Sequence, residues 1–341
     1  MTSTTMKRLL FLFVLLIGAT GARAQLQVQL SQYQINSYLY NPAIAGIEDF
    51  MDVKATYRKQ YTGIPNSPST IFLTGHKAIN QKELDKEDLG ALPMRGASTI
   101  RFKTDVPRKI RHGVGGTMIS DNLGLLNRTM VSGGYAVHFP IAKKFYLSVG
   151  ASLGLGSVGF YADGVVHNKD GGDAAYGGNR AVLPDAGLGA FLYSDKLYIG
   201  LSGSQLFMSK VNFNANTNLN KVTANYNLTA AYRIVLDDEF DFVPSGLLKY
   251  AKQSFAGDLG VKVRYRSNFY AGVAYRVANA KIDYTSDALT GLVGLTINKT
   301  IDIGYAYDFT TSALKAGSTG SHEITLGVRL FNKKAPASKL W

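Results

Sequence analysis

The sequence predicts an all-β protein, a transmembrane antiparallel β-barrel of about 14 strands with a short N-terminal periplasmic or plug segment. Three observations predict it: an export signal, strict alternation of apolar with small or polar residues, and short turns alternating with long loops. Strands of a barrel in lipid alternate in this way. An open sheet is excluded from lipid because its edge groups would lack hydrogen-bond partners.

Residues 1–24 have the order of a secretory signal peptide. Lys7 and Arg8 give a positive start, an apolar run follows, and Ala22 and Ala24 are the small residues of a cleavage site. The run is shorter than the roughly 20 residues of a membrane-spanning helix. We therefore expect cleavage after Ala24. The chain has no cysteine, which excludes a lipoprotein, disulfides, thiolate metal sites and a cysteine nucleophile.

Alternation is clearest in five segments, where every second residue is apolar and the residues between are small or polar. The segments are 145–156, 222–234, 259–266, 301–309 and 322–331. A soluble β-sandwich also alternates, because each of its sheets buries one face. The export signal and segment lengths near the ~10 residues of a membrane strand favour the barrel.

Turn lengths give the orientation of the expected barrel. Short turns fall at 194–196, 266–268 and 298–300, and longer loops at 160–180, 207–221, 278–286 and 311–320. In outer-membrane barrels the short turns face the periplasm and the long loops face the exterior.

About fifteen candidate strands run through residues 51–331, and bacterial barrels have an even number. We therefore expect 14 strands there, with 79–111 as a charged periplasmic insertion. Residues 25–50 are then either a periplasmic segment or a plug in the lumen, and 332–341 form a C-terminal tail.

Charged residues within the C-terminal strands require a role, because charges inside a membrane are costly. Asp302 and Asp308 share one face, and basic residues on nearby strands are Lys262, Arg264, Arg266, Arg276 and Arg329. We expect ion pairs that fill the lumen, since a wide barrel leaks unless it is filled. A selective channel is the alternative. The net charge of +13 is assigned to the lumen and rim rather than to nucleic-acid binding.

No catalytic, cofactor-binding or metal site is expected, and the protein is not expected to be an enzyme. Gly154, Gly156 and Gly159 spell G-x-G-x-x-G, but they lie in an alternating segment with no helix after it. The histidines make no close metal pair. His167 lies in a loop, and four others are expected near strand ends: His76, His112, His138 and His322. Asp170 and Asp173 lack the spacing of a calcium loop.

The chain at 28–46 reads VQLSQYQINSYLYNPAIAG. This opening resembles that of the PorP/SprF family of Bacteroidetes outer-membrane proteins. The positions that match the family's motifs are Ser31, Gln32, Tyr33, Asn41, Pro42, Ala43, Ala45, Gly46, Tyr57, Arg58 and Gln60. Tyr61 stands where a Trp is more usual. Blocks at 112–124, 183–206 and 322–331 are similar to family blocks in the same order.

The resemblance implies an integral outer-membrane accessory component of the type IX secretion system, which also serves gliding motility. It implies two protein partners beside outer-membrane lipid: a secreted cargo protein with a C-terminal sorting domain, and a periplasmic OmpA-like peptidoglycan-binding protein. Loops 160–180 and 207–221 are candidates for cargo contact, and segments 25–50 and 79–111 for the periplasmic partner. A porin or hydrophobic-solute channel is the alternative function. No individual binding residue is assigned.

Overall fold

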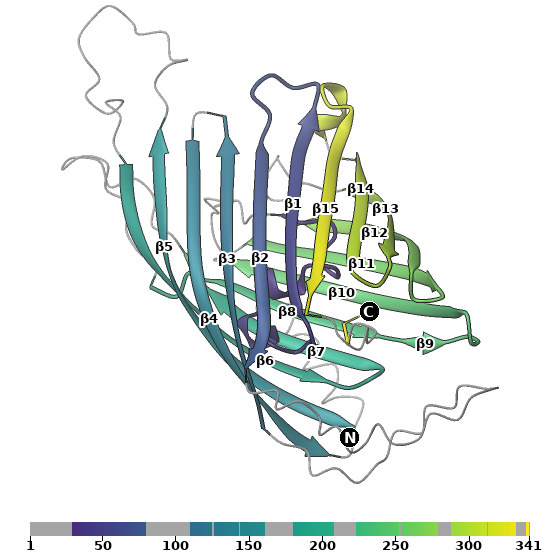
Figure 1. Ribbon diagram of the computed structural model, residues 1–341. Helices are drawn as coiled ribbons and strands as arrows, with labels where there is room; N and C mark the ends of the chain where they lie inside the picture. Colours follow the sequence, from purple (N-terminus) through teal and green to yellow (C-terminus); the bar gives the residue numbers. More distant parts are fainter. Residues whose placement is uncertain are drawn as a thin grey trace, which may run out of the picture.

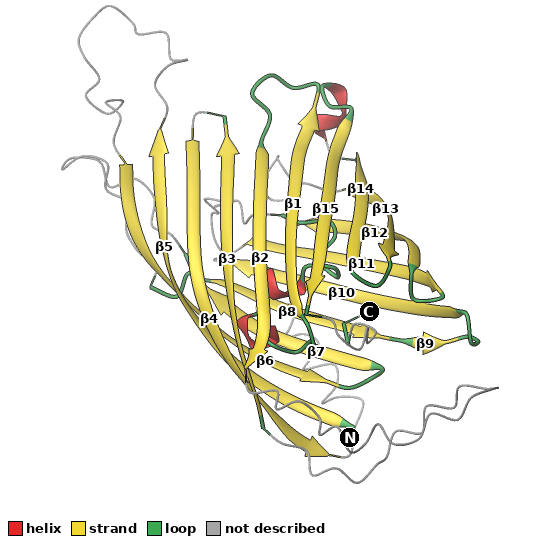
Figure 2. Ribbon diagram, in the orientation of Figure 1, coloured by secondary structure: helices red, strands yellow, loops and turns green. Residues whose placement is uncertain are grey.

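The computed structural model describes residues 29–79, 110–124, 126–142, 144–160, 180–207, 223–251, 254–278, 288–311, 313–331 and 339–340. Within them the chain forms a closed antiparallel β-barrel of 14 strands, as predicted (Figure 1). Strands make up almost all of the regular structure (Figure 2). No helix in these residues is long and apolar enough to cross a membrane.

The first seven strands are β1 (Met51–Thr62), β2 (Ser69–Ile79), β3 (Arg111–Leu123), β4 (Leu126–Ala142), β5 (Phe145–Phe160), β6 (Arg180–Tyr193) and β7 (Leu197–Ser204). The others are β8 (Asn225–Tyr232), β9 (Ile234–Val235), β10 (Phe240–Ala251), β11 (Ser254–Tyr265), β12 (Phe269–Ala278), β13 (Ala288–Ile297), β14 (Ile301–Thr310) and β15 (Gly320–Leu330). Short 3₁₀ helices are η1 (Ser37–Leu39), η2 (Pro42–Ile44) and η5 (Ala313–Ala316).

Each strand pairs with its neighbours in sequence, and β1 pairs with β15 to close the barrel, with Met51 opposite Leu330. The short β9 continues β8, because both pair with β10. The 15 strand segments β1–β15 therefore form a barrel of 14 strands. The G-x-G-x-x-G glycines all lie inside β5, as the alternation indicated.

The side chains alternate as the sequence predicted. On β5, Leu153 and Leu155 are 68% and 61% exposed on the outer surface, whereas Ser148 is buried. Buried and exposed residues also alternate along β8, β14 and β15. Ala224 departs from the expected pattern, because it precedes β8 and is buried although it was placed on the outer face. Apolar residues therefore face the lipid on all sides.

The turns at 194–196, 266–268 and 298–300 all connect strands at the end of the barrel where β1 begins and β15 finishes (Figure 1). By the outer-membrane rule this end is periplasmic. β2 and β3 also meet there, and the residues between them, 80–109, lie outside the described residues together with 161–179, 208–222 and 279–287. The signal peptide prediction and the loop acids Asp170 and Asp173 also fall outside them.

Candidate functional site

Residues 29–50 lie inside the barrel, where η1 and η2 cross the lumen (Figure 1). We call this segment the plug. Most of its side chains are buried, including Leu30, Tyr33, Ile44 and Ile47. Burial raises the pKa of Tyr33 to about 12, so this phenol stays neutral.

The local sequence fixes the bends of the plug. Asn41 precedes η2, and its side-chain oxygen accepts a hydrogen bond from the Ala43 amide at 3.0 Å. Pro42 occupies the first position of η2, where its missing amide hydrogen costs nothing. Gly46 then turns the chain at a φ of +75°, which a side chain would disfavour. These residues belong to the family motif at 28–46, so the motif encodes the shape of the plug.

The apolar side of the plug packs on aromatic residues of the barrel wall. Tyr38, Ile44 and Ile47 form one buried cluster with residues of β6 and β7, such as Phe191 and Tyr198. Close approach requires glycine in the wall: a Cβ added at position 150 would lie 2.6 Å from the Cα of Ala43. The plug is thus closely packed against this part of the barrel wall.

Lumenal hydroxyls and a histidine satisfy the carbonyl groups of the plug. Ser202 donates to the Tyr40 carbonyl at 2.6 Å, and Ser148 donates to that of Ala43 at 2.5 Å. Nε2 of His138 lies 2.8 Å from the Ala45 carbonyl. His138 lies near the end of β4, as expected, but it is fully buried against the plug rather than exposed at the rim. Because buried backbone groups need partners, these wall side chains hold the plug in one position.

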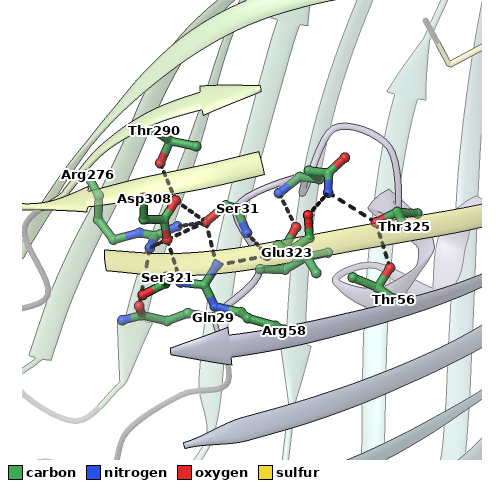
Figure 3. A network of polar contacts seen from close by, with 12 residues as sticks. Gln29, Ser31, Thr56, Arg58, Arg276, Thr290, Asp308, Ser321, Glu323 and Thr325 are labelled. Atoms are coloured by element: carbon green, nitrogen blue, oxygen red, sulfur yellow. Dashed lines mark hydrogen bonds and ion pairs between the residues drawn. The ribbon is translucent and has the colours of Figure 1, made fainter. Parts of the chain in front are cut away.

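An ion-pair network fastens the other side of the plug to β1, β14 and β15 (Figure 3). Arg58 lies 2.5 Å from Asp308 and 2.9 Å from Glu323. The amide and the hydroxyl of Ser31 donate to Glu323 and Asp308, each at 2.7 Å. The Gln32 amide donates to Glu323 at 2.8 Å.

The network extends around the wall to β12, β11 and β10. Arg276 lies 3.4 Å from Asp308 and 2.5 Å from Asp258, and Lys249 lies 3.1 Å from the same Asp258. We call Arg58, Lys249, Arg276, Asp258, Asp308 and Glu323 the plug network. It contains three cations and three carboxylates, each buried in the lumen wall.

The sequence expectations are met in part. Asp308 forms an ion pair with Arg276, as expected. Asp302 forms an ion pair with Arg329 in a separate cluster, so the two aspartates on this face of β14 belong to different groups of charges. Arg266 instead lies in an exposed turn with Glu239. Lys249, Asp258 and Glu323 were not identified as network residues, although their inward positions in alternating strands were available as a signal.

The motif residues divide between plug and wall. Those in the plug are Ser31, Gln32, Tyr33, Asn41, Pro42, Ala43 and Ala45, followed by Gly46 at its last turn. Arg58 and Gln60 point inward from β1 and are buried, whereas Tyr57 faces outward and is 48% exposed. Within the described residues, no group of His, Asp or Glu side chains is arranged to hold a metal ion.

A family model described as type IX secretion system membrane protein PorP/SprF matches residues 22–328. The chain belongs to this family. The PorP/SprF chain is therefore an integral outer-membrane β-barrel and an outer-membrane component of the type IX secretion system. The match covers the plug, the network and nearly the whole barrel.

Comparison with curated proteins gives no significant match. Among solved structures, the chain is similar to the CymD monoaromatic hydrocarbon channel, with 13% identity, a TM-score of 0.49, and coverage of 91% of this chain and 95% of that chain. It is also similar to Omp33 of Acinetobacter baumannii, with 7% identity, a TM-score of 0.46, and coverage of 84% and 100%. Likeness at this level carries no inference about ligands.

Proposed function

We propose that this PorP/SprF protein is a sealed accessory component of type IX secretion, which binds cargo carrying a C-terminal sorting domain and helps to secrete or anchor it. Family membership supports the secretion role. The observation that supports the proposal beyond family membership is the plug inside the lumen. A barrel occupied by its own N-terminal segment is suited to recognition at its rims rather than to passage through its centre.

Cargo contact is assigned to the extracellular loops. Loops 160–180 and 207–221 follow the strands that contact η2 and the rest of the plug, so the plug supports the wall from which they emerge. Loops carried on a rigid scaffold are common binding surfaces. The gliding-associated role belongs to the same proposal.

The periplasmic partner, an OmpA-like peptidoglycan-binding protein, is assigned to the opposite rim. Most of residues 29–50 are buried in the barrel and so are unavailable for it. Its contact surface would therefore be the insertion 79–111 together with the exposed end of the plug at Asp49. No catalytic step is part of this function, in keeping with the expectation that the protein is not an enzyme.

The test is purification of the tagged full-length protein from its native membrane in mild detergent, with co-purifying proteins identified by mass spectrometry. We expect a large surface protein with a C-terminal sorting domain, an OmpA-like protein, or both. A variant lacking 207–221 should lose the cargo and keep the periplasmic partner. Repeated recovery of the barrel alone would contradict the proposal.

A porin or hydrophobic-solute channel is the second candidate, and planar-bilayer conductance separates the two. A sealed barrel gives no steady current, whereas an open pore gives discrete conductance steps. Steady conductance of the unmodified protein would favour the channel and count against the sealed component.

A further inference from the structure

A second charged group lies at the periplasmic end of the lumen, outside the plug network. It comprises Arg233, Lys262, Arg264 and Arg329 with the carboxylates of Asp241 and Asp302, and we call it the basic cluster. Lys262 and Arg264 point inward from β11 close to its periplasmic end at Tyr265. The sequence singled out three of these cations, and nothing in the proposed function uses them.

The carboxylates of the basic cluster are shared among too many cations. Asp241 lies 2.9 Å from Arg233 and a looser 3.7 Å from Arg264. Asp302 is taken by Arg329, which donates to its two oxygens at 2.7 and 2.9 Å. Arg264 therefore has only a fraction of one carboxylate as its counter-charge.

Lys262 has no carboxylate partner among the described residues. Its side chain is 3% exposed, and its ammonium group lies 5.3 Å from the ring centroid of Tyr270, a cation–π contact. Arg264 is the next inward residue on the same strand and adds like-charge repulsion. A buried ammonium group without a counter-ion is costly, and an aromatic ring offsets only part of that cost.

The charge count distinguishes this cluster from the plug network. Four cations face two carboxylates, so positive charge exceeds negative charge by two within this group of described residues. The plug network, by contrast, balances its charges within the chain. Within the described residues, the basic cluster therefore has room for a further negative charge.

We propose that the basic cluster is an oxyanion-binding site that takes a carboxylate or phosphate group from the periplasmic side, held by Lys262 and Arg264. The ammonium group is a compact point charge and the guanidinium a planar donor, a pair that suits an oxygen anion. A doubly charged phosphate matches the surplus of two and should bind more tightly than a carboxylate. The inference is independent of the cargo function proposed above.

Part of the basic cluster is accessible to solvent. The side chains of Arg233 and Arg329 are 29% and 12% exposed, whereas Lys262 is buried. The guanidinium of Arg329 lies 5.4 Å from the ring centroid of Phe50, at the end of the plug. The bound anion would therefore contact the wall just beyond the plug.

Isothermal titration of the full-length protein with inorganic phosphate and with acetate, in nonionic detergent and a low-chloride buffer, tests the proposal. We expect saturable phosphate binding, weakened at least tenfold by Lys262→Met. Lys196→Gln is the matched control, because this lysine is exposed in a periplasmic turn and should change the affinity less than twofold. Phosphate binding without acetate competition would indicate a phosphate-bearing ligand, and competition by acetate a carboxylate-bearing one.

Arg264→Gln provides a second variant should Lys262→Met fold poorly, with the same tenfold loss expected. Heat unfolding gives an independent readout, because an anion that binds only the folded state raises the unfolding temperature increasingly as its concentration exceeds the Kd. The proposal is overturned if neither anion binds saturably, or if Lys262→Met and Lys196→Gln bind phosphate as the unmodified protein does.

Discussion

Two buried lysines of the lumen wall each lie over a tyrosine ring. They differ in whether a carboxylate neutralises the ammonium group. Lys249 of the plug network lies 5.4 Å from the Tyr40 ring and 3.1 Å from Asp258. Lys262 of the basic cluster lies 5.3 Å from the Tyr270 ring with no carboxylate partner in the described residues. Each is 3% exposed and comes from one of two adjacent strands, β10 and β11.

The difference indicates two purposes for buried charge. In the plug network the carboxylates that neutralise the cations belong to the wall. One of them, Glu323, also accepts hydrogen bonds from the backbone amides of Ser31 and Gln32. This arrangement stabilises one position of the plug. In the basic cluster the counter-charge is incomplete, which destabilises the empty protein and favours an added anion. Single substitutions can test this contrast, beginning with the one of largest expected effect.

Arg58→Met should cause the largest loss of stability. The substitution leaves Asp308 and Glu323 buried without their shared cation, and breaking a buried ion pair on one side costs about 3–5 kcal/mol. Urea unfolding in detergent, followed by far-UV circular dichroism, measures it. Arg266→Met is the control, since the ion pair of Arg266 with Glu239 is exposed to solvent and should contribute little to stability. Equal effects of the two substitutions would contradict the role given to the network.

The same variant tests whether the network holds the plug. Without Arg58, the two carboxylates that bind Ser31 repel each other, so the plug should leave its position more often. Planar-bilayer recordings should then show intermittent conductance that the unmodified protein lacks. A silent Arg58→Met barrel that is folded would show that apolar packing around Ile44 and Phe191 is sufficient to retain the plug.

The fold could be predicted from the sequence because membrane strands repeat one local rule. Alternation along β14 and β15 is enough to put Asp308 and Glu323 on the inward face. Their partners could not be assigned, since pairing across the lumen depends on strand order and stagger. Arg58 reaches Asp308 from β1 past β15, and 250 residues separate the two in sequence.

The position of the plug required tertiary information for the same reason. Its sequence has no strand or helix period long enough to identify a partner surface. The family motif marked Asn41 and Gly46 without indicating what they contact. The wall glycines that they approach, Gly189 for Asn41 and Gly113 for Gly46, are indistinguishable in sequence from other glycines of the strands.

Lys249→Met should destabilise the barrel by about 2 kcal/mol, because Asp258 loses one of two cations and stays buried. The loss is smaller than for Arg58 since Arg276 remains 2.5 Å from Asp258. Urea unfolding under the same conditions measures it. An increase in stability would show that Asp258 does not compensate for burying the Lys249 ammonium group.

Lys262→Met should increase the free energy of unfolding, rather than decrease it, in buffer without phosphate or carboxylate. Replacing an unpartnered buried ammonium with an apolar side chain of similar length removes its desolvation cost, and we expect a gain of about 1 kcal/mol. Saturating phosphate should reverse the order, so that the unmodified protein becomes the more stable. A loss of stability in anion-free buffer would mean that Tyr270 alone compensates for the buried charge.

The smallest expected effect concerns the periplasmic end of the plug, where the C-terminal residues dock. The amide of Lys339 donates to Glu48 at 2.9 Å, and its ammonium group lies 2.8 Å from Asp49. Burial opposes ionisation of Asp49, but Lys339 and Arg111 outweigh it and hold its pKa below the ordinary value of 3.8. Because the pKa of Asp49 is lower in the folded than in the unfolded protein, its ionised carboxylate stabilises the folded state above pH 4. This stabilisation is lost as the pH falls through the folded-state pKa.

Asp49→Asn should therefore remove a small part of the acid sensitivity of the folded protein. Because Asp49 is 40% exposed by side chain, solvent screening limits the contribution to less than ~1 kcal/mol. Urea unfolding of the two proteins at pH 7 and below pH 4 measures the difference, which should be present at pH 7 and vanish in acid. If the difference is the same at both pH values, the Asp49 side chain acts through packing rather than charge. The tail is then held by the Glu48 carboxylate, which accepts hydrogen bonds from the backbone amides of Lys339 and Leu340.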